Sequence, residues 1–203
     1  MMSFQLNDLE LLYNHALNSN LIVETGGGGK STIYLAKAAE HSGAHMVTIE
    51  ERPSRLNNRI SHVDYKVGWS VAYSDLIKKG HALFLDLPTA HRRKRYRWSD
   101  RKVSMHGEKF MKGETDLIRK VVQEYGQPID FFFCDTGEYC GLAEWNVARG
   151  MIPLHGKFAC HDIYYPKSIK CFQVAKHIEE NSDWNVLVKT SSKQGLLIAE
   201  KIQ

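Results

Sequence analysis

Residues 21–32 read LIVETGGGGKST, and this stretch decides the fold that we predict for the chain. An apolar run, an acid and four glycines precede Lys30, Ser31 and Thr32, which open a segment of helical composition. Because glycine has no Cβ, its backbone can take positive φ and approach a ligand closely, while the following helix offers free N–H groups. The stretch therefore predicts a strand, a tight turn and a helix N-terminus that together hold a small charged ligand.

Phosphate is one ligand that such a turn can hold. A phosphate-binding loop reads G-x-x-x-x-G-K-[ST], and Gly29, Lys30 and Ser31 supply its last three positions. Its first glycine falls on Glu24, whose carboxylate would face the phosphates. A nucleotide enzyme with a phosphate loop is therefore kept only as an alternative, which ATP binding that depends on Lys30 would support.

The composition is that of an ordinary globular protein. The 203 residues are 43% hydrophobic and 25% charged, with a net charge of +4. This length favours one domain, residues 1–203, and the composition argues against a disordered or membrane-spanning chain. The first 20 residues include Asp8 and Glu10 and lack the pattern of a signal peptide, so we expect a cytoplasmic protein.

The cysteines show no metal-binding pattern. None of the four has the C-x-x-C spacing that marks structural zinc. We expect buried free thiols, because cysteine commonly packs as a small hydrophobe. The positions are Cys134, Cys140, Cys160 and Cys171.

Helical and strand patterns alternate along most of the chain. Helices are expected at residues 5–18, 31–41, 52–61, 71–79, 114–125, 141–149 and 166–180. Strands are expected at the start of residues 21–32 and at 44–49, 63–67, 129–135, 157–161, 184–189 and 195–199. The last two strands, joined by a short polar loop, read as an antiparallel hairpin. We predict an α/β, Rossmann-like sheet of seven mostly parallel strands, with helices on both faces and this C-terminal hairpin.

Polar residues at the ends of the second and third strands extend the predicted ligand site. Glu50 lies about 20 residues beyond the glycine turn, where an acid in nucleotide-type sites accepts hydrogen bonds from ribose hydroxyls. Its alternative role is to cap the following helix. Gly68, Trp69 and Ser70 end the third strand, and we expect them beside an adenine ring. Trp69 suits the hydrophobic core equally well.

An insertion at about residues 81–111 interrupts the alternation between strands three and four. It is longer than usual connections and contains the basic run HRRKRYRW at residues 91–98. Arginines interleaved with aromatic residues suit phosphates and stacked bases, so nucleic acid is a possible partner. A solvated surface loop explains the run equally well. The cations concerned are Arg92, Arg93, Lys94, Arg95 and Arg97.

The turn, the strand-end acids and the terminal hairpin follow the order found in class I S-adenosylmethionine (SAM)-dependent methyltransferases. The chain resembles this superfamily over residues 5–203, outside the insertion. Within it, IDFFFCDTGEY at residues 129–139 and FACHDIYY at residues 158–165 resemble blocks of the small-molecule O-methyltransferases.

The resemblance implies SAM as cofactor and assigns residues to its parts. Glu24, Gly26 and Gly28 correspond to the turn at the methionine end. Glu50 corresponds to the ribose-binding acid, and Asp135 also borders the cofactor. Gly68, Trp69 and Ser70 correspond to the residues beside the adenine.

The resemblance also implies catalytic residues, namely Asp135, His161 and Asp162. In related enzymes, acids that match Asp135 and Asp162 hold Mg²⁺, an ion that prefers such oxygen ligands. Ile163 stands where one branch has an asparagine ligand, so Glu138 or His161 would have to replace it. Without a metal, His161 is the best candidate for the base, although a purely structural role suits it equally.

The function implied is SAM-dependent methylation of a hydroxyl group on a small molecule. One alternative is a methyltransferase that acts on RNA or another phosphate-rich acceptor through the basic run. The N-P-P-Y signature of base methylation is absent, since residues 135–138 read DTGE. A second alternative is a protein that binds SAM without transferring its methyl group.

Overall fold

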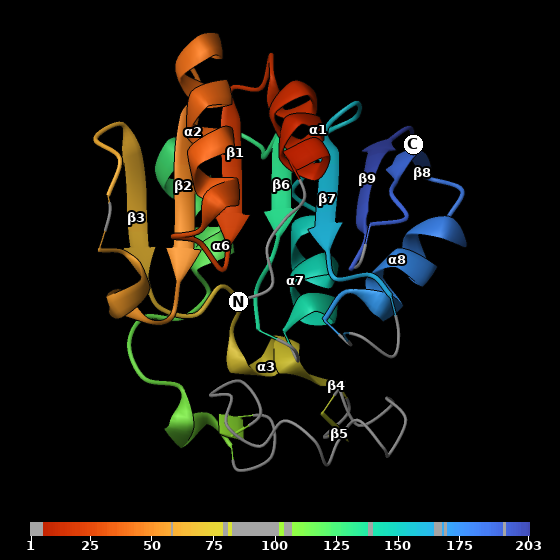
Figure 1. The fold of residues 1–203 in the computed structure, drawn as a ribbon. Coiled ribbons are helices and arrows are strands. Elements are labelled where there is room, and N and C mark those ends of the chain that lie inside the picture. Colours follow the sequence, from red (N-terminus) through yellow and green to blue (C-terminus); the bar gives the residue numbers. More distant parts are fainter. Residues whose placement is uncertain are drawn as a thin grey trace.

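The computed structural model describes residues 6–57, 59–78, 81–82, 102–103, 107–137, 140–164, 168, 170–192 and 194–203, and Figure 1 shows its fold. A seven-stranded sheet runs in the order β3-β2-β1-β6-β7-β9-β8. Its strands are β1 Leu21–Thr25, β2 His45–Glu50, β3 Val63–Val67, β6 Phe131–Cys134, β7 Lys157–His161, β8 Trp184–Lys189 and β9 Leu196–Lys201. The described α-helices are α1 Leu6–Ala16, α2 Lys30–Ser42, α3 Tyr73–Leu76, α6 Leu117–Tyr125, α7 Gly141–Ala148 and α8 Phe172–Glu179.

The pairing of the strands confirms the predicted α/β sheet. β1 pairs in parallel with β2 and β6, β2 pairs in parallel with β3, and β6 pairs in parallel with β7. β9 lies antiparallel to both β7 and β8, so the C-terminal hairpin folds back into the sheet. The carboxyl ends of β1, β2, β3, β6 and β7 therefore meet at one edge, which is the lower edge in Figure 1.

The sheet buries an apolar layer on each face. Phe131 and Phe133 point to the face that α1 and α2 cover, and they pack with Leu12 and Leu35. The intervening Phe132 points to the other face, among residues of α6, α7 and α8 such as Trp145. Successive side chains of a strand alternate between faces, so a continuous apolar strand needs helices on both sides. Figure 1 shows α1 and α2 in front of the sheet and α6 and α7 behind it.

The cysteines agree with a further expectation. All four cysteines are buried free thiols, which confirms their predicted role as small apolar residues. Among the described residues, no helix has both the length and the apolar character needed to cross a membrane.

Three predicted helices are wrong in extent. In the described part of residues 52–61, only Pro53–Arg55 is helical, as a 3-10 turn, and Leu56 is the one fully buried apolar side chain, so a helix there would bury little apolar surface. The helix predicted at residues 71–79 is only α3, which is followed by the short antiparallel pair β4 Ile77–Lys78 and β5 His81–Ala82. The last described helix begins only at Phe172, since the Cys171 N–H binds the carbonyl of Asp162 at 3.4 Å, and the predicted start at residue 166 lies outside the described residues.

The segments that flank the predicted insertion, residues 81–111, meet at the carboxyl edge. Gly68, after β3, forms a parallel bridge with Glu114, before α6. The Trp69 N–H donates to the Glu114 carbonyl at 2.7 Å, and the Leu117 N–H donates to the Trp69 carbonyl at 3.1 Å. A 3-10 turn, Glu108–Phe110, precedes this junction. The basic run at residues 91–98 lies outside the described residues.

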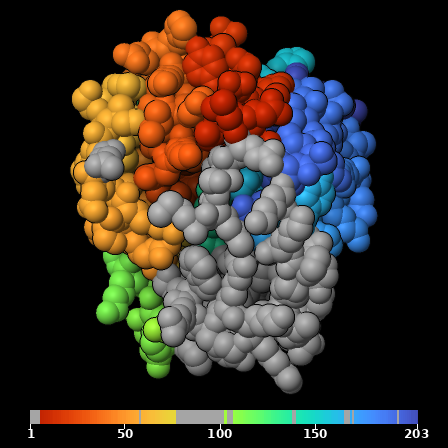
Figure 2. All heavy atoms as spheres, viewed as in Figure 1, coloured from red at the N-terminus to blue at the C-terminus, as the bar shows by residue number. Residues whose placement is uncertain are grey.

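The space-filling view shows how the layers enclose the sheet. In Figure 2, atoms of α1 and α2 cover its upper front, in red and orange. The C-terminal hairpin and α8 form the blue flank, and β3 lies on the opposite flank. Described residues from distant parts of the sequence thus form one continuous body around the sheet.

Gly26 offers a test of the backbone constraint at the carboxyl edge. Its φ is +78°, and a Cβ would meet the Asp135 carbonyl oxygen at 2.1 Å. Gly43 has a similar φ of +69° but nothing within 4 Å of a Cβ. We expect Gly43→Ala to lower the free energy of unfolding by about 1 kcal/mol and Gly26→Ala to lower it by about 3 kcal/mol or more, because only the second adds a backbone clash. Urea unfolding measures both, and equal losses would contradict the close approach.

Candidate functional site

The glycine turn lies at the end of β1, where the chain packs against its own backbone. Gly26 approaches the main chain of Asp135, as described above. Gly28 has φ +88°, and a Cβ there would meet the Arg55 carbonyl oxygen at 2.3 Å. A Cβ on Gly27 would meet the Thr48 hydroxyl oxygen at 1.7 Å. The expected reason for the glycines was the approach of a ligand, whereas the structure shows that the protein itself already requires three of them.

Glu24 connects three elements below the turn. Its carboxylate is fully buried and accepts hydrogen bonds from the hydroxyls of Ser31 and Thr32, both at 2.6 Å, and of Thr48 at 2.8 Å. Burial raises the pKa of Glu24 to about 7, although the three hydroxyl groups act in the opposite direction. Lys30 and Ser31 form the first turn of α2, as the strand-turn-helix interpretation predicts.

Glu50 ends β2 and is almost completely buried. It accepts hydrogen bonds from the Arg52 N–H at 2.9 Å and from the Arg55 guanidinium at 3.2 Å. The bond to Arg52 resembles the alternative capping role, although here it fixes a bend before a single 3-10 turn. A carboxylate has about four lone-pair positions, so these two donors leave capacity for a ligand hydroxyl.

Glu144, a residue that the sequence analysis missed, binds the segment that follows the third strand. Trp69 is buried in the apolar core, and the Ser70 hydroxyl donates to Glu144. Glu144 lies on α7, has no exposed surface and also accepts from Thr25 at 2.7 Å and from the Cys134 thiol at 3.2 Å. Burial raises its pKa. An acid within the apolar helix sequence GLAEWNVA was the available signal.

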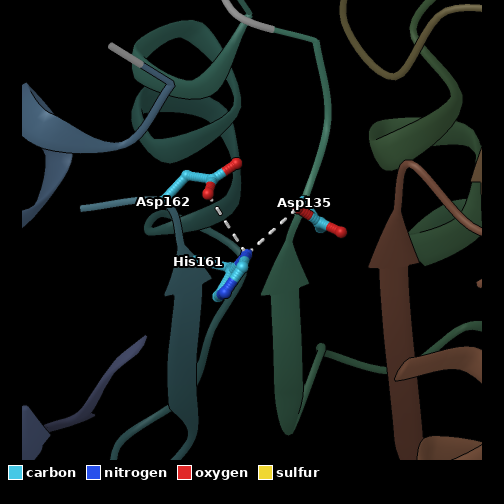
Figure 3. Close-up of side chains that lie close together, drawn as sticks. All are labelled: Asp135, His161 and Asp162. Carbon is cyan, nitrogen blue, oxygen red and sulfur yellow. Dashed lines mark ion pairs between the residues drawn. The ribbon is translucent and has the colours of Figure 1, made fainter. Parts of the chain in front are cut away.

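Asp135, His161 and Asp162 lie together at the tips of β6 and β7, as predicted. His161 Nδ1 is 3.8 Å from Asp135 Oδ1 and 3.5 Å from Asp162 Oδ1, and Figure 3 shows the imidazole between the two strand ends. Asp162 has φ +66°, a strained value for a residue other than glycine. Its buried Oδ1 accepts no hydrogen bond from the described part of the chain.

Lys170 completes this cluster and was also missed by sequence reasoning. Its Nζ lies 2.6 Å from Asp135 Oδ1 and 2.8 Å from Asp162 Oδ2, and its side chain is only 11% exposed. Burial alone would lower the pKa of Lys170, but the two carboxylates raise it above its usual value. For Asp135, burial by itself would raise the pKa, but the positive charge of Lys170 and the contact with His161 lower it below its usual value. The cluster therefore holds an ammonium between two acidic side chains.

The residues present do not fit the Mg²⁺ ion that the resemblance implied. Mg²⁺ binds carboxylate oxygens at about 2.0–2.1 Å in a near-octahedral shell, and Lys170 Nζ already occupies the space between Asp135 and Asp162. Ile163 is buried and offers no ligand atom. Glu138, the other proposed ligand, lies outside the described residues.

Comparison with known proteins relates the fold to solved structures only. No model of a protein family and no curated protein sequence matches the chain. An O-methyltransferase from Bacillus cereus in complex with SAH matches with a TM-score of 0.61 and 15% identity, over 98% of this chain and 82% of that one. An O-methyltransferase from Streptomyces achromogenes involved in tomaymycin synthesis, in complex with SAM, matches with a TM-score of 0.57 and 15% identity, over 99% and 82%.

A third structure extends the same likeness. An rRNA methylase from Streptococcus thermophilus matches with a TM-score of 0.52 and 12% identity, over 100% of this chain and 99% of that one. The chain therefore has the fold of these methyltransferases, with the predicted seven-stranded, mostly parallel sheet and C-terminal hairpin.

The raised pKa of Glu24 predicts a pH dependence of stability. In the folded protein Glu24 keeps its proton up to a pH of about 7, against 4.5 for an exposed carboxyl group. The contribution of protonated Glu24 to the free energy of unfolding is complete below pH 4.5 and is lost as the pH rises through 7. The stability advantage of the wild type over Glu24→Gln should therefore fall by up to about 3 kcal/mol across this window.

Urea unfolding at a series of pH values measures this difference. The exposed Glu40 on α2 gives the control Glu40→Gln, which we expect to follow the wild-type curve. A constant difference between the wild type and Glu24→Gln would contradict the raised pKa.

Proposed function

We propose that this chain is a SAM-dependent methyltransferase that transfers the methyl group to a hydroxyl oxygen of a small molecule. The observation that carries the proposal is the gathering of two groups of residues at one edge of this sheet. The glycine turn and Glu50 lie at the ends of β1 and β2, and Asp135, His161 and Asp162 lie at the ends of β6 and β7. Ligands of open parallel sheets bind outside the carboxyl ends of the strands.

The cofactor would lie across the tips of β1, β2 and β3. In this arrangement, the turn that contains Gly26 and Gly28 borders the methionine end, and Glu50 binds the ribose hydroxyls. Gly68 and Ser70 are near the adenine, with Trp69 supporting them from the core. Glu24 acts from beneath the turn, because its oxygens bind Ser31, Thr32 and Thr48. Asp135 then stands between the cofactor and the acceptor.

The reaction needs a positioned oxygen and a place for one proton. Bound SAM would supply an electrophilic methyl carbon, to which the acceptor oxygen would bond as the carbon–sulfur bond breaks and its electron pair goes to sulfur. The hydroxyl proton leaves at the same time. Asp162 Oδ1, buried and with no described hydrogen-bond donor, can accept this hydrogen, and His161 Nδ1 lies 3.5 Å from the same oxygen.

The other candidate functions stay predictions. The basic run, on which RNA binding depends, lies outside the described residues, and no contact among the described residues favours it. A protein that binds SAM without transfer has the same cofactor site, so it differs only in turnover. We propose a cytoplasmic location on the basis of the sequence alone.

The first test measures SAM binding by isothermal titration calorimetry. We expect Glu50→Gln to weaken binding by about tenfold or more, because hydrogen bonds from ribose to an ionised carboxylate contribute about 1.5–3 kcal/mol. Glu51→Gln is the matched control at the next position and should leave the affinity unchanged. Equal affinities in all three proteins would contradict the assignment of Glu50.

The second part of the test detects transfer directly. The purified protein is incubated with SAM labelled in its methyl group and with a panel of phenols and aliphatic alcohols. Labelled methyl ether is the expected product. Binding of SAM without product from any acceptor would favour the non-catalytic alternative.

A further inference from the structure

Lys170 provides the strand-tip cluster with a cation of its own. Its Nζ donates to Asp135 Oδ1 at 2.6 Å, to Asp162 Oδ2 at 2.8 Å and, more weakly, to the Asp135 carbonyl at 3.4 Å. These atoms belong to the tips of two neighbouring strands and to the segment that precedes α8. The ammonium thus binds the tips of two strands and links them to the segment before α8, which is more than a single exposed ion pair.

The ammonium lies where a metal ion at the carboxyl edge would bind. A divalent ion at this place would bind the same two carboxylates, and it would lie beside the positive charge of Lys170. Two cations that share one pair of oxygens repel each other strongly in a partly buried site. The cluster therefore accommodates either the ammonium or a metal ion, but not both.

The neighbouring residues also favour the ammonium. Ile163, which follows Asp162, supplies no oxygen, and His161 supplies a nitrogen where Mg²⁺ prefers oxygen. A lysine ammonium needs only the hydrogen-bond acceptors that are present. Close contact of one cation with two carboxylates also reduces the repulsion between Asp135 and Asp162.

We propose that the Lys170 ammonium takes the place of a divalent metal ion in this chain and excludes such an ion from the strand-tip cluster. Its role in catalysis rests on the proposed function, whereas the exclusion of metal does not. In the transfer reaction, the ammonium would lie near the acceptor oxygen and stabilise the negative charge that develops as the hydroxyl proton leaves. Lys170 remains protonated throughout, so the balance of the reaction is unchanged.

The test measures Mn²⁺ binding by electron paramagnetic resonance on the full chain after treatment with a chelator. We expect the wild type to bind Mn²⁺ no more tightly than Asp162→Asn does. Lys170→Ala should bind it at least about tenfold more tightly, because the two carboxylates then lack a cation. Addition of Asp162→Asn to Lys170→Ala should abolish this gain. The exposed Lys176 gives the control Lys176→Ala, which should behave as the wild type.

Two results would overturn the proposal. One is tight Mn²⁺ binding by the wild type that Asp162→Asn removes, a measurement that needs no lysine variant. The other is a folded Lys170→Ala protein, checked by circular dichroism, with unchanged Mn²⁺ affinity. If Lys170→Ala does not fold, Lys170→Gln replaces it in the same titration.

An activity measurement separates this proposal from the proposed function. With an acceptor that is methylated, we expect the same rate in the presence of a chelator and of added Mg²⁺. A rate that requires Mg²⁺ would contradict the role of Lys170. Absence of turnover with every acceptor would contradict the proposed function and leave the Mn²⁺ result to decide the inference about Lys170.

Discussion

The burial of acidic groups at the carboxyl edge of the sheet is the constraint on which the rest of the structure depends. Glu24, Glu144, Asp135 and Asp162 all lie there, and an isolated carboxylate is costly to remove from water. Each one is therefore matched by specific donors from other segments. These donors fix how the strand tips, α2, α7 and the segment before α8 lie relative to one another.

Two kinds of compensation occur at this edge. Glu24 and Glu144 are surrounded by neutral hydroxyl or thiol donors, and burial raises the pKa of both. Asp135 instead faces the ammonium of Lys170, and its pKa is lowered despite burial. The first kind provides a rigid support beneath the turn and the strand ends, whereas the second places ionised groups together at the tips of β6 and β7.

This division agrees with the two tasks of the proposed enzyme. The half of the edge formed by β1, β2 and β3 presents backbone turns and Glu50, which suit the polar parts of a cofactor. The half formed by β6 and β7 presents Asp135, His161 and Asp162 around one cation, which suits the oxygen that accepts the methyl group. Glu144 connects the two halves, because it accepts hydrogen bonds from Ser70 and Thr25 of the first half and from the Cys134 thiol at the end of β6.

The sequence by itself determined the sheet, because apolar strands and glycine turns are local patterns that repeat along the chain. It also placed Glu50, Asp135, His161 and Asp162 at one edge, since parallel strands bring their carboxyl ends together. It could not identify Lys170 or Glu144 as site residues, because their roles depend on contacts with residues that lie 35 and 119 positions away along the chain. It overestimated the helix at residues 52–61 for a related reason, since helical propensity without a buried face does not sustain a helix. Only the tertiary structure decided which charges meet, and it brought Lys170 between Asp135 and Asp162.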